Sequence, residues 1–120
     1  MILINQLAKQ TGTPIHTIRY YENYGLFKGK KNAAIRTNNY NWYDEEVIQK
    51  LELIKEAKAV GFTLSEIKGL IDAWYNKRLS EQKKKAILEK KMADIEKRIE
   101  HLQQMKQLIA ECINDIAENG

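Results

Sequence analysis

Cysteine, proline and long apolar runs are scarce in this chain of 120 residues, which has one cysteine and one proline. A single cysteine excludes an internal disulfide and fits a reducing compartment. No apolar run approaches the length of about 20 residues that a membrane helix needs, and no signal peptide is recognisable at the start. We therefore expect a cytoplasmic protein that has no membrane partner.

The chemical signatures of enzymes and metal proteins are also lacking. The sequence shows no nucleophile–base pair and no glycine loop that would cradle a phosphate. One cysteine and two distant histidines cannot form an ordinary closed metal site within one chain. We expect no enzymatic activity, no cofactor and no metal. For Cys112, two interpretations stay open: a buried apolar side chain, or a redox or electrophile sensor.

Positive charge is in excess, and its distribution is informative. Residues 1–79 carry 12 Lys and Arg against 8 Asp and Glu, whereas residues 80–120 carry 8 of each, so the net charge of +4 lies entirely in the first part. Such a balance favours a polyanionic partner there. A merely soluble basic surface is the alternative.

The segment Thr13–Leu26, TPIHTIRYYENYGL, predicts the central helix. Thr13 suits an N-cap, Pro14 suits the first helical position, and Gly25 suits a left-handed C-cap. A shorter helix is predicted over Asn5–Gln10. Two short helices joined by a tight turn that contains glycine are typical of a helix-turn-helix.

The predicted central helix has a polar outer face. Helical spacing places Ile15, Ile18 and the stem of Glu22 on one side. The opposite side and its flanks carry groups that can meet phosphates and base edges: His16, Thr17 and Tyr20 outward, with Arg19 and Tyr21 on the flanks.

Residues 27–43 change character, because helical periodicity disappears and basic residues alternate with asparagines and aromatics. The cations are Lys28, Lys30, Lys31 and Arg36. The alternation over Tyr40–Tyr43 predicts a short strand after a loop. A basic hairpin beside a helix-turn-helix is typical of a wing that grips the phosphate backbone. A flexible basic loop is the alternative.

Two further helices follow. One is predicted from Asp44, a suitable N-cap, to about Val60. The next begins with a capping box at Thr63–Glu66 and ends between Trp74 and Lys77. We interpret it mainly as a core-forming helix.

Residues 80–118 contain neither proline nor glycine and predict one long helix. Apolar residues recur in alternating steps of four and three, with a gap at Lys106: Leu88, Met92, Ile95, Ile99, Leu102, Ile109, Ile113 and Ile116. This heptad seam needs a partner helix, which a second copy of the chain supplies most simply. Packing of the helix on its own domain is the alternative. The predicted domains are residues 1–79 and 80–120.

Several of these motifs together resemble the MerR family of bacterial transcription regulators. LINQLAKQTGTPIHTIRYYENYGL resembles the first helix-turn-helix of the family, with its Arg-Tyr-Tyr-Glu signature. NYNWYDEEVIQKL resembles the end of the wing and the third helix, and AVGFTLSEIKGLI resembles the second helix-turn-helix. The closing heptads resemble the dimerisation helix.

The resemblance implies a mainly α fold: a winged helix-turn-helix followed by a long helix that forms an antiparallel coiled coil in a homodimer. It implies binding to a palindromic operator in double-stranded DNA, inside a promoter whose elements are spaced too far apart for RNA polymerase. Family members distort such DNA so that the polymerase can use it.

Roles for individual residues follow from the resemblance. Arg19, Tyr20 and Tyr21 match signature residues that hold phosphates, and His16 and Thr17 lie where bases would be contacted. The wing positions are Arg36, Tyr40 and Tyr43. Asn41 stands where the family usually has arginine, and Lys28, Lys30 and Lys31 would supply the missing charge.

The resemblance does not indicate the signal to which this regulator would respond. The start of the long helix lacks the cysteine of metal-sensing members, and we expect no metal loop or drug-binding domain after Gly120. A module of another class also stays open: a MerR-like fold that modulates a protein such as a chaperone and does not bind DNA.

Overall fold

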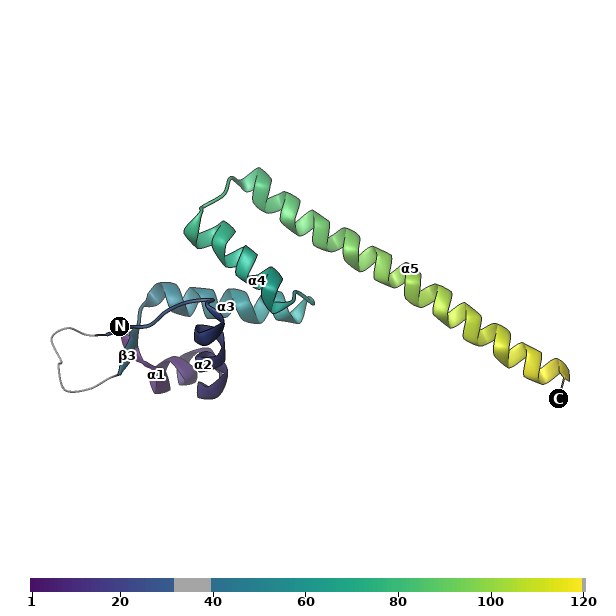
Figure 1. Ribbon diagram of the computed structural model, residues 1–120, viewed down its shortest axis with the longest axis horizontal. Helices are drawn as coiled ribbons and strands as arrows, with labels where there is room; N and C mark the ends of the chain where they lie inside the picture. The colour runs from purple at the N-terminus through teal and green to yellow at the C-terminus, as the bar shows by residue number, and fades with distance from the viewer. Residues whose placement is uncertain (32–39, 120) are drawn as a thin grey trace. The chain divides into compact units, whose positions relative to one another are not determined.

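The computed structural model describes residues 1–31 and 40–119, and Figure 1 shows its helices and strands. The chain divides into two compact units, Met1–Arg78 and Leu79–Gly120. Among the described residues, the first unit contains four α-helices, a short π-helical segment and a small sheet, and the second is one long helix. The predicted wing residue Arg36 lies outside the described residues.

The first two helices form the expected helix-turn-helix. Helix α1 spans Ile4–Thr11 and helix α2 spans Ile15–Tyr24. Gly12, with φ 68°, and Gly25, with φ 100°, end these helices in the left-handed region, where glycine is favoured.

The start of α2 differs from the prediction. Pro14 is the N-cap, and its carbonyl accepts hydrogen bonds from the N–H groups of Thr17 and Ile18. The Thr13 hydroxyl is buried and has no hydrogen-bond partner among the described residues. Burial against the core thus withdraws Thr13 from the capping role that its side chain would otherwise suit.

A three-stranded antiparallel sheet lies beside the helices. Its order is β1 (Ile2–Leu3), β3 (Asn41–Tyr43), β2 (Lys30–Lys31). Ile2 pairs with Tyr43, and Lys30 pairs with Trp42. The pairing of β2 with β3 is the expected basic hairpin of a wing, whereas β1 was not expected from the sequence.

Two more helices complete the first unit. Helix α3 spans Glu45–Ala59, and Asp44 caps it by accepting from the Val47 N–H at 3.1 Å. Helix α4 spans Leu64–Ile71, and the capping box between Thr63 and Glu66 is present as predicted. The predicted last turns form a separate π-helical segment, η1, over Asp72–Asn76.

The core of the first unit joins all four helices to the sheet. Hydrophobic side chains at helical spacing provide it, and burial of this kind is the main source of folding free energy. The buried hydrophobic residues are Leu7, Ile18, Tyr21, Leu26, Phe27, Tyr43, Val47, Leu51, Ile54, Ala57, Ile67, Leu70, Ile71 and Ala73.

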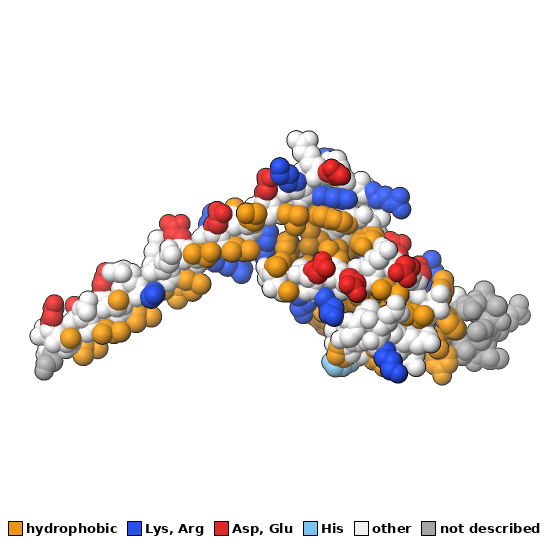
Figure 2. Space-filling model, turned by 180° about the vertical axis from the view of Figure 1, so that it is seen from behind, with side chains coloured by type: hydrophobic (Ala, Val, Ile, Leu, Met, Phe, Trp, Pro, Cys, Tyr) orange, Lys and Arg blue, Asp and Glu red, His pale blue; other side chains and the backbone are white. Residues whose placement is uncertain are grey.

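The second unit is helix α5, which spans Glu81–Asn119. All of the predicted seam side chains are exposed in the single chain, from 36% for Ile95 to 72% for Ile116. Figure 2 shows hydrophobic side chains following one edge of this long helix. None of the helices in the described segments is long and apolar enough to cross a lipid bilayer.

Candidate nucleic-acid interface

The outer face of α2 presents most of the predicted contact residues. His16 and Arg19 are exposed, Tyr20 is 55% exposed, and Thr17 is half-buried. Ile18, on the opposite side of the same helix, is fully buried. The predicted division of α2 into a buried face and a polar outer face is therefore observed for these residues.

Two of the predicted contact tyrosines are placed differently. Tyr21 was expected on a flank of α2 but is buried, and the Lys58 ammonium lies 3.5 Å from its hydroxyl. Tyr43 is also buried, and its hydroxyl donates to Glu22 Oε1 at 2.6 Å. Burial, reinforced by the Glu22 carboxylate, raises the pKa of Tyr43 to about 12. Both rings thus belong to the core of the first unit.

The root of the wing, residues 28–31 and 40–43, carries exposed basic side chains. Lys28, Lys30 and Lys31 are exposed, and Tyr40 is 62% exposed. The Lys30 ammonium lies 3.6 Å from a carboxylate oxygen of Asp44. Because an exposed ion pair contributes only about 0–1 kcal/mol, Lys30 can exchange this partner for a phosphate at little cost.

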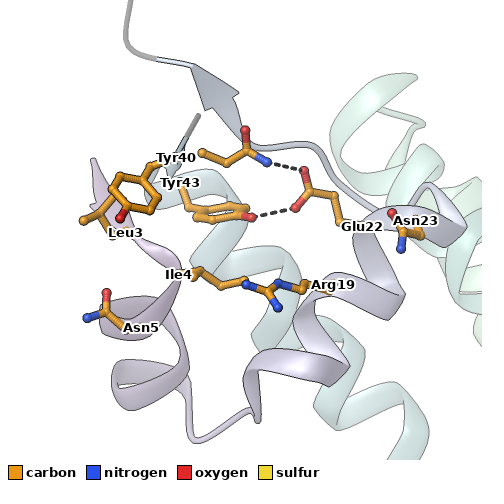
Figure 3. A pocket seen from close by; sticks show the side chains of 9 residues that line it. Leu3, Ile4, Asn5, Arg19, Glu22, Asn23, Tyr40 and Tyr43 are labelled. Carbon is orange, nitrogen blue, oxygen red and sulfur yellow. Dashed lines mark hydrogen bonds between the residues drawn. The ribbon is translucent and has the colours of Figure 1, made fainter. Parts of the chain in front are cut away.

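A groove of about 600 Å³ is lined by the first residues of the chain together with parts of α2 and β3 (Figure 3). It is lined by Leu3, Ile4, Asn5, Arg19, Glu22, Asn23, Tyr40, Asn41 and Tyr43. In Figure 3 the Arg19 side chain extends from α2 toward Ile4. Within the described part of the chain, Arg19 forms no ion pair, so its guanidinium is available for an anion.

Lysines from α3 and α4 contact tyrosines of α2, and these contacts were not predicted from the sequence. The Lys68 ammonium lies 5.9 Å from the centre of the Tyr24 ring, and the Lys58 ammonium lies 5.8 Å from that of Tyr21. Both distances fit cation–π contacts. The charge excess in residues 1–79 gave no signal for these two lysines, because the four cations of residues 27–43 already equal the whole excess.

The arrangement offers cations, hydroxyls and amides on one side of the first unit, which is the chemistry that holds a phosphate backbone. Within residues 1–31 and 40–119, no three His, Cys, Asp or Glu side chains are grouped as metal ligands. Cys112 is exposed in the single chain, so its interpretation as a buried apolar residue depends on a partner.

Comparison with known proteins gives two family matches. The model described as MerR HTH family regulatory protein matches residues 3–74, and the model described as MerR, DNA binding matches residues 48–112. The HTH-type transcriptional regulator CueR of Yersinia pestis is 35% identical over 117 residues, which is 93% of this chain and 81% of that protein.

Two solved structures share the fold. The transcription regulator PbrR691 of Ralstonia metallidurans, in complex with lead(II), has a TM-score of 0.79 at 24% identity and covers 92% of this chain and 84% of its own. HiNmlR, a MerR family regulator that lacks the sensor domain and is bound to promoter DNA, has a TM-score of 0.61 at 17% identity. The match covers 92% of this chain and 86% of that protein's chain. The expected winged helix-turn-helix followed by a long helix is confirmed.

Proposed function

This chain belongs to the MerR family of transcription regulators, and we propose that it binds a palindromic promoter operator as a homodimer. It is a transcription regulator with a DNA-binding domain and not an enzyme. The observation that carries the proposal is the exposed polar face of α2 beside a basic wing root. We assign the regulator to the cytoplasm, where promoter DNA and RNA polymerase are found in bacteria.

The residues divide into two roles in this proposal. Arg19 and Tyr20 hold phosphates, together with the wing residues Lys28, Lys31 and Tyr40, because they offer exposed cations and hydroxyls. His16 and Thr17, near the start of α2, contact base edges. Tyr21 and Tyr43, which are buried, support these residues and do not serve as surface contacts.

Dimerisation is proposed through α5. Its apolar seam continues for about four heptads and is exposed in the single chain, an arrangement that favours burial against an identical helix. An antiparallel coil would hold two DNA-binding units at a set separation, as the two half-sites of a palindrome require. The proposed consequence is distortion of the promoter, so that RNA polymerase can use it.

A footprint on the DNA upstream of the protein's own gene tests this function. We expect protection of two half-sites inside a promoter, and binding that weakens steeply as salt is raised. A duplex of the same composition with the palindrome scrambled is the control. Lack of salt-sensitive binding to this DNA, or to related palindromes, would contradict the proposal and favour a protein-interaction module.

A further inference from the structure

A carboxylate lies within the surface that we propose binds DNA. Glu22 is half-buried on α2, one turn after Arg19, and it lines both the groove of Figure 3 and a second hollow bordered by Lys28, Lys30 and Lys31. A negative charge at this place repels phosphate. The position of Glu22 beside the wing lysines therefore indicates a role other than direct contact with DNA.

Both oxygens of Glu22 accept hydrogen bonds from the wing. The Tyr43 hydroxyl donates to Oε1 at 2.6 Å, a short distance that is typical of a charge-assisted bond. The Gly29 N–H donates to Oε2 at 3.0 Å, and the Asn41 side-chain amide reaches the same oxygen at 3.5 Å. Gly29 lies just before β2, whereas Asn41 and Tyr43 belong to β3, so one carboxylate joins both sides of the wing to α2.

The backbone at Gly29 is pressed against β3 at this point. A Cβ atom at Gly29 would lie 2.8 Å from Asn41 Cβ and 2.9 Å from Tyr43 Cε1, which is closer than such atoms approach. The Phe27 ring meets the Tyr43 ring edge-on at 6.3 Å. The segment that carries the wing lysines is therefore held on both sides of Lys28, by the buried Phe27 and by Gly29.

We propose that Glu22 is a positioning residue for DNA binding. Its carboxylate locks the root of the wing to α2, so that the wing lysines and Arg19 meet the phosphate backbone as one rigid surface. This inference rests on the proposed DNA-binding function. It also accounts for Arg19, because a carboxylate whose oxygens are occupied by the wing leaves the neighbouring guanidinium free for phosphate.

Two different roles of Glu22 predict opposite effects of Glu22→Gln on the affinity for DNA. If the carboxylate acted on DNA only through its charge, Glu22→Gln would strengthen binding, since it removes repulsion. If the carboxylate holds the wing, Glu22→Gln weakens binding. The amide keeps the size of the side chain but turns one acceptor into a donor, so the Tyr43 hydroxyl and the Gly29 N–H can no longer both donate to it from their present positions.

The test compares three variants of the full chain on an operator duplex over a range of salt concentrations. Glu22→Gln removes the charge and one acceptor, and Tyr43→Phe removes only the hydroxyl donor. Glu45→Gln, on the exposed first turn of α3, removes an equal charge from a carboxylate that forms no hydrogen bond to the described residues of the wing. Amide hydrogen exchange at Gly29, measured without DNA, reports the lock directly.

We expect Glu22→Gln and Tyr43→Phe each to weaken binding about 3- to 30-fold and to lower the salt slope by about 1–3, as lost phosphate contacts do. Gly29 should exchange faster in Glu22→Gln, with the core amides of α3 still protected. Glu45→Gln should bind equally well or more tightly. If Glu22→Gln does not fold, the operator affinity and salt slope of Tyr43→Phe test the positioning role.

Two results would overturn the inference in distinguishable ways. Equal or tighter binding by Glu22→Gln, with unchanged exchange at Gly29, contradicts the positioning role while leaving DNA binding intact. Failure of the unsubstituted protein to bind any operator DNA contradicts the proposed function itself, and the role of Glu22 in it.

Discussion

Replacement of Ile113 by alanine tests whether the exposed seam of α5 is a dimer interface. Ile113 is 62% exposed in the single chain, so a partner helix could remove most of its side chain from water. Full burial of an isoleucine contributes about 1.5–3 kcal/mol, so this exposed fraction corresponds to about 1–2 kcal/mol. A symmetric dimer contains the residue twice, which gives about 2–4 kcal/mol per dimer.

Alanine retains part of this gain by burying its own methyl group. We therefore expect Ile113→Ala to cost about 1.4–2.8 kcal/mol of association free energy, which raises the dissociation constant about 10- to 100-fold. Sedimentation equilibrium over a range of protein concentrations measures this constant. His101→Ala, at an exposed outer heptad position of the same helix, is the matched control and should leave the constant unchanged.

The refuting result is clear. A dissociation constant that is the same for Ile113→Ala and His101→Ala would show that the seam does not pair two chains. Loss of thermal stability without any change in association would instead support packing of α5 on its own domain, the alternative that the heptad pattern left open.

Three further predictions concern the first unit. Arg19→Ala should weaken binding to every DNA sequence and reduce the salt slope by about 1. His16→Ala should change sequence preference more than affinity. Titrations on matched operator and scrambled duplexes distinguish these two effects. Gly29→Ala should destabilise the fold by about 1–3 kcal/mol, because its Cβ would overlap Asn41 and Tyr43. Thermal unfolding measures this loss, and an unchanged Tm would contradict the close packing. The pKa of Tyr43 is raised from 10.0 to about 12, so its contribution to stability is present below pH 10 and is lost as the pH rises through about 12. Phenolate absorbance and unfolding followed together should show that loss, and Tyr43→Phe should lack it.

Helix boundaries were predicted well where the signal is local. Asp44 caps α3, the capping box of Thr63 and Glu66 starts α4, and Gly25 ends α2, all as expected. Each of these signals depends on hydrogen bonds between residues at most four apart, so sequence neighbours suffice. Thr13 is the exception, because its hydroxyl is buried and does not cap the helix.

Strand β1 escaped prediction for a related reason. Ile2 and Leu3 form a strand because β3 lies beside them, and two apolar residues alone carry no period to detect. The convergence of Lys58 and Lys68 on Tyr21 and Tyr24 escaped prediction as well, since packing of α3 and α4 brings these lysines back to α2.

The sequence by itself determined the order of the elements, the polar face of α2 and the seam of α5, because periodicity and capping act over one or two helical turns. The tertiary structure decided which groups remain available to a partner. Glu22 and Tyr43 are 21 positions apart, and the sequence placed Glu22 on the inner side of the central helix and Tyr43 in the wing, with no signal that links them. Only folding brings the hydroxyl to the carboxylate, satisfies both within the protein, and leaves Arg19 and the wing lysines exposed.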